Sequence, residues 1–340
     1  MEMPPSLKIP KQLPTHEAPP MVMALYAAGF NAWNQLYFGE DSSCSDPEDV
    51  FTFTKVLTDN ALERPYAGLH YTLVRGQSGH HVAGNGTDLT HHIDTTFVAG
   101  NGLTLSVHTD GSQKSKDIQT NGTEPPRGHC IVKYTSYEDC KAGHNPVTLP
   151  WTKPIQEVAP YEAGFVVLFQ DGTVATLGDA RYQECLARDV TTESAADKLE
   201  PVPDLMSLGD PIKHVSASGY VLAALTESGS VYIWGRKAPG SHDQYADIFD
   251  DLGAIPNYCE IGGGLDVQDF ALGDSHAIAL TTDGDVYVIG GNRNGQLGVG
   301  QCRDFLVREW TRINLGLPAS CHIVGVTAGP RSSFIITACK

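Results

Sequence analysis

Two stretches near opposite ends of the 340-residue chain share one pattern. The first reads LYAAGFNAWNQL and ends at Leu36, and the second reads VYVIGGNRNGQL and ends at Leu297. Alignment of the two strings gives five matched pairs: Tyr26 and Tyr287, Gly29 and Gly290, Asn31 and Asn292, Gln35 and Gln296, Leu36 and Leu297. Self-similarity of this kind is typical of repeat architectures, in which each unit buries its apolar face against a neighbour. It restricts the possible folds more than any other feature of the sequence.

The repeated unit is clearest over residues 267–300. Its first half contains FALGDSHAIALT, whose alternation of apolar and polar residues predicts strands with one buried face. Asp283 and Gly284 then turn the chain into the strand DVYVIG, which ends in a Gly-Asn loop. An Asp-Gly pair between alternating segments predicts a hairpin with a two-residue turn and glycine at positive φ. We expect the same turn at Gly172, which also follows an aspartate.

The first half of the unit recurs along the chain, each time with a glycine near the end of its first strand. These glycines are Gly68, Gly100, Gly164, Gly219, Gly273 and Gly329. The last copy, residues 326–340, contains the first half alone, and the N-terminal string supplies the missing second half. We therefore expect a ring in which the N-terminal strand pairs with the C-terminal strands, so that no long sheet edge is exposed.

The unit at residues 267–300 resembles the repeat of the regulator of chromosome condensation family. The residues on its pattern are His276, Asp283, Gly284, Tyr287, Asn292, Gly295, Gln296 and Leu297. The resemblance covers roughly residues 23–340 and implies an all-β fold, a β-propeller of four-stranded blades, usually seven in that family. The sequence shows six first halves, so we expect six or seven blades. Seven is favoured, with the seventh hidden in an insertion at residues 112–150.

The expected domain organisation is a flexible, proline-rich segment at residues 1–21 followed by one propeller domain at residues 22–340. The chain is similar to compact stand-alone members of the family, such as the alpha-tubulin suppressor type that assists a diphthamide and tRNA-modification partner. The founding member of the family is a nucleotide exchange factor for a small nuclear GTPase and docks on nucleosomes, and another relative is a bacterial inhibitor of β-lactamase. Because these roles share no chemistry, the fold alone does not determine the function.

Composition narrows the classes of partner and compartment. The formal charge is −17, from 23 basic and 40 acidic residues, so direct binding to nucleic acid or to an anionic membrane is disfavoured. No apolar run is long enough to span a bilayer, and the N-terminal residues contain no apolar core of a signal peptide. The eight cysteines form no C-x-x-C pair, and without a signal peptide we expect reduced thiols in the cytoplasm, the nucleus or both. We also expect a monomer.

The sequence contains no pattern of a nucleophile elbow, a phosphate-binding loop or a zinc protease. Eight of the 13 histidines lie between His70 and His144, and the pairs at residues 80–81 and 91–92 have Asp88 and Asp94 nearby. A metal site there is conceivable, but no ligand spacing is fixed, and solvated or hydrogen-bonded histidines are favoured. We expect no catalytic residue, no metal and no cofactor.

Two acidic loops follow the third strand of their units. The first holds Glu40, Asp41, Asp46, Glu48 and Asp49, and the second holds Asp243, Asp247, Asp250 and Asp251 together with Tyr245 and Phe249. Equivalent positions in a propeller project to one face, so the two loops are expected to share a rim. Solvated charge is the simpler interpretation, but aromatic residues beside charge are typical of protein interfaces. These eleven residues are therefore the candidate partner-binding site.

The sequence thus predicts a protein without enzyme activity, a scaffold or regulatory propeller that binds a basic protein partner through loops on one face. The alternative is a guanine nucleotide exchange factor for a small GTPase. That activity requires a protruding wedge, for which the insertion at residues 112–150 is the one large candidate.

Overall fold

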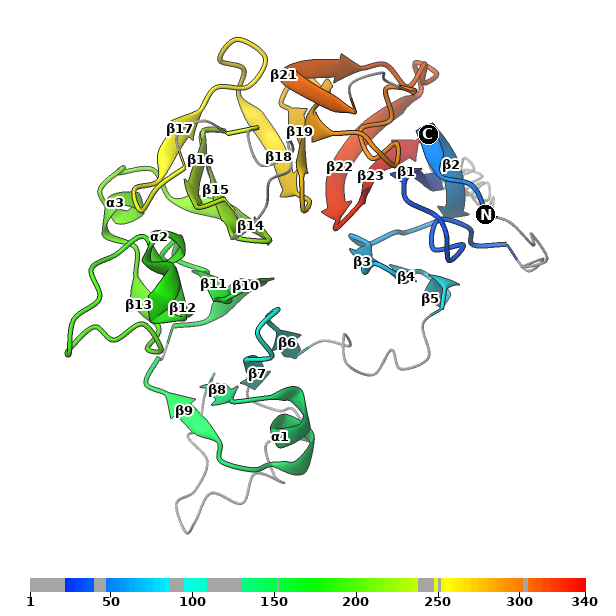
Figure 1. Cartoon of the computed structure of the whole chain (residues 1–340). Coiled ribbons are helices and arrows are strands. Elements are labelled where there is room, and N and C mark those ends of the chain that lie inside the picture. Colours follow the sequence, from blue (N-terminus) through cyan, green and yellow to red (C-terminus); the bar gives the residue numbers. More distant parts are fainter. Residues whose placement is uncertain are drawn as a thin grey trace, which may run out of the picture.

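The computed structural model describes residues 22–39, 47–85, 95–108, 130–151, 153–237, 248–249, 252–301 and 305–340. In this part of the chain, six antiparallel sheets stand around a common axis, as Figure 1 shows. The alternating apolar residues give each sheet two faces that pack against neighbouring sheets. The fold is therefore the expected all-β propeller.

The blades are numbered in chain order. Blade 1 consists of β3 (Tyr66–Ala67), β4 (Tyr71–Gly76) and β5 (Gly79–Gly84); blade 2 of β6 (Thr96–Val98), β7 (Thr104–His108), β8 (Cys130–Tyr134) and β9 (Val147–Leu149); blade 3 of β10 (Ile155–Tyr161), β11 (Gly164–Phe169), β12 (Val174–Gly178) and β13 (Glu200–Pro201). Blade 4 consists of β14 (Ile212–Ser218), β15 (Val221–Thr226), β16 (Val231–Gly235) and β17 (Asn257–Cys259); blade 5 of β18 (Val267–Leu272), β19 (His276–Thr281), β20 (Val286–Gly291) and β21 (Leu306–Ile313). Blade 6 combines β22 (Cys321–Gly329) and β23 (Ser332–Cys339) with β1 (Val22–Gly29) and β2 (Val50–Asp59).

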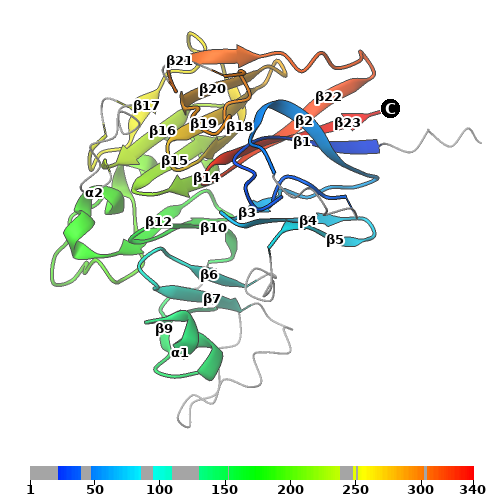
Figure 2. The ribbon, with the colours of Figure 1, turned by 45° about the vertical axis from the view of Figure 1, so that its right-hand side comes forward.

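Helical structure in the described residues is confined to short segments: α1 (Tyr137–Ala142), the 3₁₀ turn Ala180–Tyr182, α2 (Gln183–Leu186) and α3 (Pro203–Met206). Figures 1 and 2 both place α1 at the periphery of the ring, beside β8 and β9. Ser136 caps the N-terminus of α1 by accepting a hydrogen bond from the amide of Asp139, and Gly143 ends it in the left-handed conformation. Within the described residues, no helix has the length and hydrophobicity needed to cross a membrane.

The described residues form six blades, which corrects the favoured count of seven. The insertion at residues 112–150 is not a blade of its own, because β8 pairs with β7 and β9 pairs with β8. It supplies the outer half of blade 2, separated from the inner half by residues 109–129, which lie outside the described part of the chain. In the sequence, the long segment between the paired strands β7 and β8 had the length expected of an additional repeat.

Blade 6 closes the ring as the sequence predicted. Its strand order is β2-β1-β23-β22, and β1 pairs along its whole length with β23, from Val22 opposite Cys339 to Gly29 opposite Ser332. Leu25, Ala27 and Ala28 of β1 are completely buried. The first described strand is therefore part of the core, and Figure 1 shows the two ends of the propeller side by side. The N-terminal segment 1–21 lies outside the described residues.

A disulfide joins Cys321 and Cys339, which corrects the expectation that every thiol is reduced. The two cysteines lie directly opposite each other on β22 and β23, with their Cα atoms 4.1 Å apart. Cross-strand pairs of this kind leave no sequence motif, because their spacing depends on hairpin length alone. Cys130, Cys140, Cys185 and Cys259 lie outside this disulfide.

Apolar side chains fill the spaces between neighbouring sheets. Between blades 3 and 4, the fully buried Trp234 packs with residues of β11, β14 and α2, and its indole Nε1 donates a hydrogen bond of 3.1 Å to the carbonyl of Cys185. Equivalent apolar clusters lie between blades 2 and 3, between blades 4 and 5, and between blades 5 and 6. Burial of this apolar area is the main term that holds the blades together.

The hairpin turns have the predicted glycine but one more residue than expected. Gly172, Gly229 and Gly284 have positive φ of 80°, 101° and 86°. In the last of these turns, the amide of Gly284 donates to the carbonyl of Thr281, and the amide of Thr281 donates to the carbonyl of Asp285. These bonds enclose three loop residues, the type I turn with a left-handed third residue that is common in hairpins. The expectation of a two-residue turn was therefore wrong in length and correct in conformation.

Two of these glycines differ in their surroundings, which gives a matched pair of substitutions. A Cβ at Gly229 would lie 2.8 Å from the amide nitrogen of Val267 in the next blade, whereas a Cβ at Gly284 would meet nothing within 4 Å. We expect Gly284→Ala to lower the free energy of unfolding by about 1 kcal/mol through backbone strain alone. Gly229→Ala should lower it by a further 1–3 kcal/mol or so, because the neighbouring backbone must move. Urea unfolding of both variants measures the difference, and equal losses would contradict the inter-blade contact.

Ring closure by β1 predicts a sharp difference between two deletions. Removal of residues 1–39 deletes the whole of β1, exposes the edge of β23 and uncovers the core residues that β1 buries. We expect that variant to aggregate or to lose most of its stability. Removal of residues 1–20 leaves β1 intact and serves as the control, with an unchanged melting temperature. A soluble 1–39 deletion that melts like the full chain would show that β1 is dispensable.

Candidate functional site

One face of the ring carries the long loops, and we call it the loop face. In each of blades 4, 5 and 6, the end of the third strand pairs with the start of the second: Gly235 with Val221, Gly290 with His276, and Gly29 with Ser332. The turn after the innermost strand and the loop after the third strand therefore emerge on the same side. Neighbouring innermost turns are hydrogen bonded, since the amide of Glu162 donates to Gly219 and the amide of Asp274 donates to Pro330.

The two strings that revealed the repeat form the same side-chain-braced loop on this face. Asn31 Oδ1 accepts from the amide of Leu36, and Asn292 Oδ1 accepts from the amide of Leu297, both at 3.0 Å. Gln35 Oε1 accepts from the amide of Trp33, and Gln296 Oε1 accepts from the amide of Asn294, both at 2.9 Å. The Asn and Gln side chains thus replace backbone partners in a loop that has no regular structure. The braced loop holds its tip, Trp33 or Asn294, in a fixed position.

In blade 6 the braced loop presents aromatic side chains to solvent, in what we call the aromatic patch: Trp33, Tyr37, Leu69 and His70. Trp33, Tyr37 and Leu69 are 44%, 47% and 37% exposed. Trp33 packs edge-on against the ring of His70 at 5.1 Å between centroids, and Gln35 Nε2 donates to the carbonyl of Leu69. The loop of blade 6 is therefore fixed to the β3–β4 turn of blade 1. The sequence signal for Trp33 was its place two residues after the repeated Asn31.

A cavity of about 270 Å³ opens on the loop face between blades 4, 5 and 6. Its lining includes the cationic side chains of Arg236, Lys237, Arg293 and Arg331 and the carboxylate of Asp274. The apolar part of the wall comes from Val221, Ile248, Phe249 and Leu252. Sequence reasoning missed this cavity, because its basic residues come from three separate loops of a chain with an overall charge of −17.

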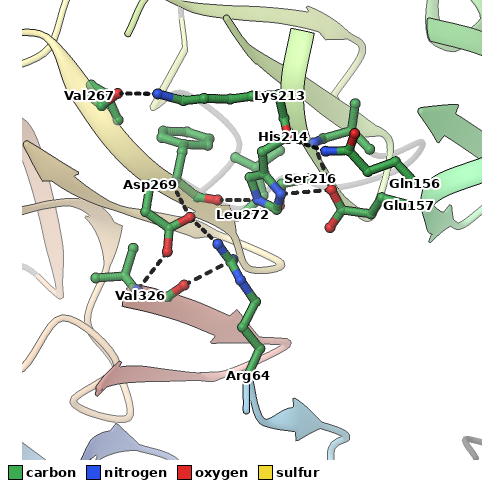
Figure 3. A network of polar contacts seen from close by, with 12 residues as sticks. Arg64, Gln156, Glu157, Lys213, His214, Ser216, Val267, Asp269, Leu272 and Val326 are labelled. Carbon is green, nitrogen blue, oxygen red and sulfur yellow. Dashed lines mark hydrogen bonds and ion pairs between the residues drawn. The ribbon is translucent and has the colours of Figure 1, made fainter. Parts of the chain in front are cut away.

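A second polar cluster lies on the innermost strands, around the axis (Figure 3). Glu157, His214 and Asp269 follow equivalent β-bulges in β10, β14 and β18. Each side chain reaches the next blade. Glu157 Oε2 accepts from the amide of Val215, His214 Nε2 lies 2.8 Å from the carbonyl oxygen of Phe270, and Asp269 Oδ2 accepts from the amide of Val326.

Arg64 completes this cluster from the segment that leads into blade 1. Its guanidinium forms an ion pair with Asp269 and donates to the carbonyl of Val326, and His214 Nδ1 lies 2.8 Å from Glu157. A His, two carboxylates and an Arg could suggest catalysis. However, most of the hydrogen bonds and ion pairs drawn in Figure 3 join one blade to another. The cluster therefore serves as a clasp between neighbouring innermost strands, and we call it the inner clasp.

Three of the eleven residues of the predicted acidic site lie in the described part of the chain, and the site as a whole stays a prediction. Within the first loop, Asp49 Oδ1 accepts from the amide of Asn31 at 2.9 Å, and Asp49 Oδ2 accepts from Asn294 Nδ2 at 2.7 Å, so this carboxylate ties the braced loops of blades 6 and 5 together. Glu48 contributes its carbonyl to Asn31. In the second loop, the half-buried Phe249 packs against the core between blades 4 and 5. The other eight residues lie outside the described part of the chain: Glu40, Asp41, Asp46, Asp243, Tyr245, Asp247, Asp250 and Asp251.

The histidine-rich region shows no metal site where it is described. His81 Nε2 lies 2.8 Å from Asp59 Oδ2, and this hydrogen bond is the main reason that the pKa of Asp59 is lowered. In the parts of the chain that the structure describes, no group of three His, Cys, Asp or Glu side chains could hold a metal ion. His91, His92, Asp88 and Asp94 lie outside those parts, so the interpretation of that segment remains a prediction.

His276 is a buried histidine of the repeat that links blades 5 and 6. Its ring is completely buried, and Nε2 lies 2.9 Å from the hydroxyl of Ser333. A Cβ at Gly273 would overlap the imidazole, so this glycine makes room for the ring. Burial lowers the pKa of His276 to about 4. The side chain is therefore neutral at physiological pH and acts as part of the core.

Comparison with known sequences identifies the repeat. The profile of the "Regulator of chromosome condensation (RCC1) repeat" matches residues 267–296. The Regulator of chromosome condensation of Mus musculus is 31% identical over 147 residues, which are 42% of this chain and 33% of that protein. The Ultraviolet-B receptor UVR8 of Arabidopsis thaliana is 33% identical over 116 residues, 34% of this chain and 26% of that protein. The chain thus spans about a third or less of the length of these curated relatives.

Comparison with solved structures supports the same fold over nearly the whole chain. Human WBSCR16 has a TM-score of 0.57 and 14% identity, covering 92% of this chain and 98% of that chain. Yeast RCC1 (Prp20), solved bound to Kap60, has a TM-score of 0.52 and 12% identity, covering 99% and 97%. At such identities the likeness concerns the fold alone.

The depressed pKa of His276 makes stability depend on pH in a defined window. The folded pKa is about 4 and the unfolded value about 6.5, so the unfolded chain binds the proton first as the pH falls. The contribution of neutral His276 to the free energy of unfolding is fully present above pH 6.5. It is smaller by about 2 kcal/mol at pH 5 and is lost below about pH 4. His276→Gln should remove this component from urea unfolding curves, whereas His144→Gln, at an exposed histidine, should not. Equal pH dependence in wild type and His276→Gln would contradict it.

Proposed function

We propose that this RCC1-like β-propeller works as a non-catalytic protein-interaction module that binds a partner through the loop face. Yeast relatives of the same fold support a binding role for this architecture. Yeast RCC1 (Prp20) binds Kap60, and Prp20p of Saccharomyces cerevisiae has binding properties toward Gsp1p and histones. Those partners belong to that protein, and we carry over the use of a propeller as a binding platform.

The aromatic patch is the observation that supports this proposal most strongly. Protein interfaces are enriched in Trp and Tyr, which dominate the binding energy when they are buried by a partner. Trp33 and Tyr37 are large, exposed and already ordered by the bonds of Asn31 and Gln35. Binding would therefore cost little side-chain entropy, since the loop does not have to be organised first.

We further propose that the acidic residues of the two loops steer the partner to this face, which would make the partner basic where it faces those two loops. Of the acidic residues described, Glu48 is exposed and supports such a role, whereas the Asp49 carboxylate positions the braced loops of blades 5 and 6. Exposed carboxylates raise the rate of encounter more than they lengthen the complex lifetime. In this proposal the protein acts as a monomer in the cytoplasm, the nucleus or both.

An exchange factor for a small GTPase is the second candidate. The likeness in fold to yeast Prp20p, which has been studied for its binding to Gsp1p, favours it. In this chain, part of the insertion at residues 112–150 forms β8, α1 and β9 of blade 2, and these described residues are built into the propeller. A nucleotide-release assay with a panel of small GTPases separates the two candidates, since a binding module without exchange activity leaves the release rate unchanged.

The aromatic patch gives a direct test. Trp33→Ala combined with Tyr37→Ala should reduce capture of binding partners from a lysate, with a loss of about 2 kcal/mol or more, or about 30-fold in Kd, for a purified partner. Tyr258→Ala is the matched control, because this tyrosine is 53% exposed on β17, away from the loop face. All variants should melt like the wild type. An unchanged set of partners for the folded double variant would refute the patch as the binding surface.

A further inference from the structure

The described lining of the cavity on the loop face has a charge opposite to that of the protein as a whole. Among the described residues, the side chains of Arg236, Lys237, Arg293 and Arg331 line it together with one carboxylate, that of Asp274, on a chain with a net charge of −17. Among its cations, Arg293 and Arg331 are exposed, and neither forms an ion pair with another described residue. Arg236 forms an ion pair with Glu184, with 3.7 Å between Nη1 and Oε1. We propose that this cavity is the binding site for an acidic segment of a protein partner, with carboxylates on the arginines and one apolar side chain in the cavity.

The cavity wall explains why an apolar side chain should accompany the carboxylates. Val221, Phe249 and Leu252 form one side of the cavity, and all three also pack against the buried core between blades 4 and 5. The wall is therefore firm, and an aliphatic or aromatic side chain that enters gains burial without rearranging it. A purely polar anion would leave this apolar surface unused.

Size and charge favour a peptide segment over the other anionic ligands. A volume of about 270 Å³ lies below the range of roughly 300–1,000 Å³ that is typical of sites for cofactors and drug-sized molecules. Nucleic acid would extend far beyond the cavity, onto the acidic remainder of the surface. A short acidic segment interacts mainly with the local cations, because charges more than about 8 Å away are screened at physiological ionic strength.

Arg331 connects the cavity to the segment that leads into the aromatic patch. The guanidinium carbon of Arg331 lies 5.9 Å from the ring centroid of Phe30, which directly precedes the braced loop of Trp33. A partner seated on the patch can therefore extend an acidic segment toward Arg331 and into the cavity. The inference rests on the proposed function of the loop face, and it adds the chemistry of one part of the partner.

The test uses the full-length protein on an array of short peptides in which net charge and apolar content vary independently, with oligodeoxythymidine spots included. We expect wild type to favour peptides that combine several carboxylates with a leucine or phenylalanine. The variant Arg293→Glu, Arg331→Glu should lose this preference and bind the best peptide about tenfold or more weakly in solution. The control variant Lys55→Glu, Arg308→Glu reverses two exposed charges on the outer strands β2 and β21 and should bind like wild type. Raising NaCl from about 50 to about 500 mM should weaken binding to wild type.

Three results would overturn the inference: no preference of wild type for acidic peptides, equal peptide binding by the Arg293→Glu, Arg331→Glu variant, or tighter binding of the oligonucleotide than of any peptide. Each is distinguishable from a failure of the proposed function, which is judged by the capture of partners by the Trp33→Ala, Tyr37→Ala variant. If that variant loses partners while the cavity variant binds peptides normally, the loop face remains a binding surface and the cavity proposal is wrong.

Discussion

The inner clasp is the contact on which the geometry of the ring depends. Apolar packing between sheets is strong but non-directional, so by itself it leaves the blades free to slide. The clasp adds direction, because Glu157, His214 and Asp269 each bond to a defined backbone group of the next innermost strand. The bulge before each residue turns its side chain toward the neighbouring blade. Since removal of one partner would leave a half-buried polar group without a bond, the clasp favours one register over all others.

Because the innermost strands are fixed in register, the turns at their ends are fixed as well. The aromatic patch and the cavity are both assembled from loops of different blades, so neither exists unless these loops keep their relative positions. Asp49 shows how far this coupling extends, since one carboxylate bonds to the braced loops of two blades. The described side chains have two separate roles. Polar side chains near the axis determine the architecture, whereas exposed side chains of the loops, such as Trp33 and Arg293, are available for binding.

Much of the fold could be predicted from the sequence, because a repeat shows its period directly. The pairing of β1 with β23 and the positive φ of Gly284 both followed from aligned strings. The blade count could not be predicted in this way, because the two halves of blade 2 are separated by a long insertion. The disulfide and the cavity were missed for a common reason. Cys321 and Cys339, like Arg236 and Arg331, come together through strand register and blade order, which no local pattern records. Asn31 was recognised as repeated, but its role as a brace required its hydrogen bonds.

The split composition of blade 6 has a consequence for the order of events during synthesis. Met23 on β1 pairs with Ala338 on β23. The strand β1 is synthesised before the other five blades, but it cannot pair with β23 until these blades have been synthesised. Until then β1 and β2 have no inner partner, and their apolar side chains, including Leu25 and Ala27, lack the surface that covers them. Contacts between such distant residues form slowly, because the intervening chain must be ordered first. The nascent chain is therefore expected to need protection of this early strand for as long as the other five blades are being made.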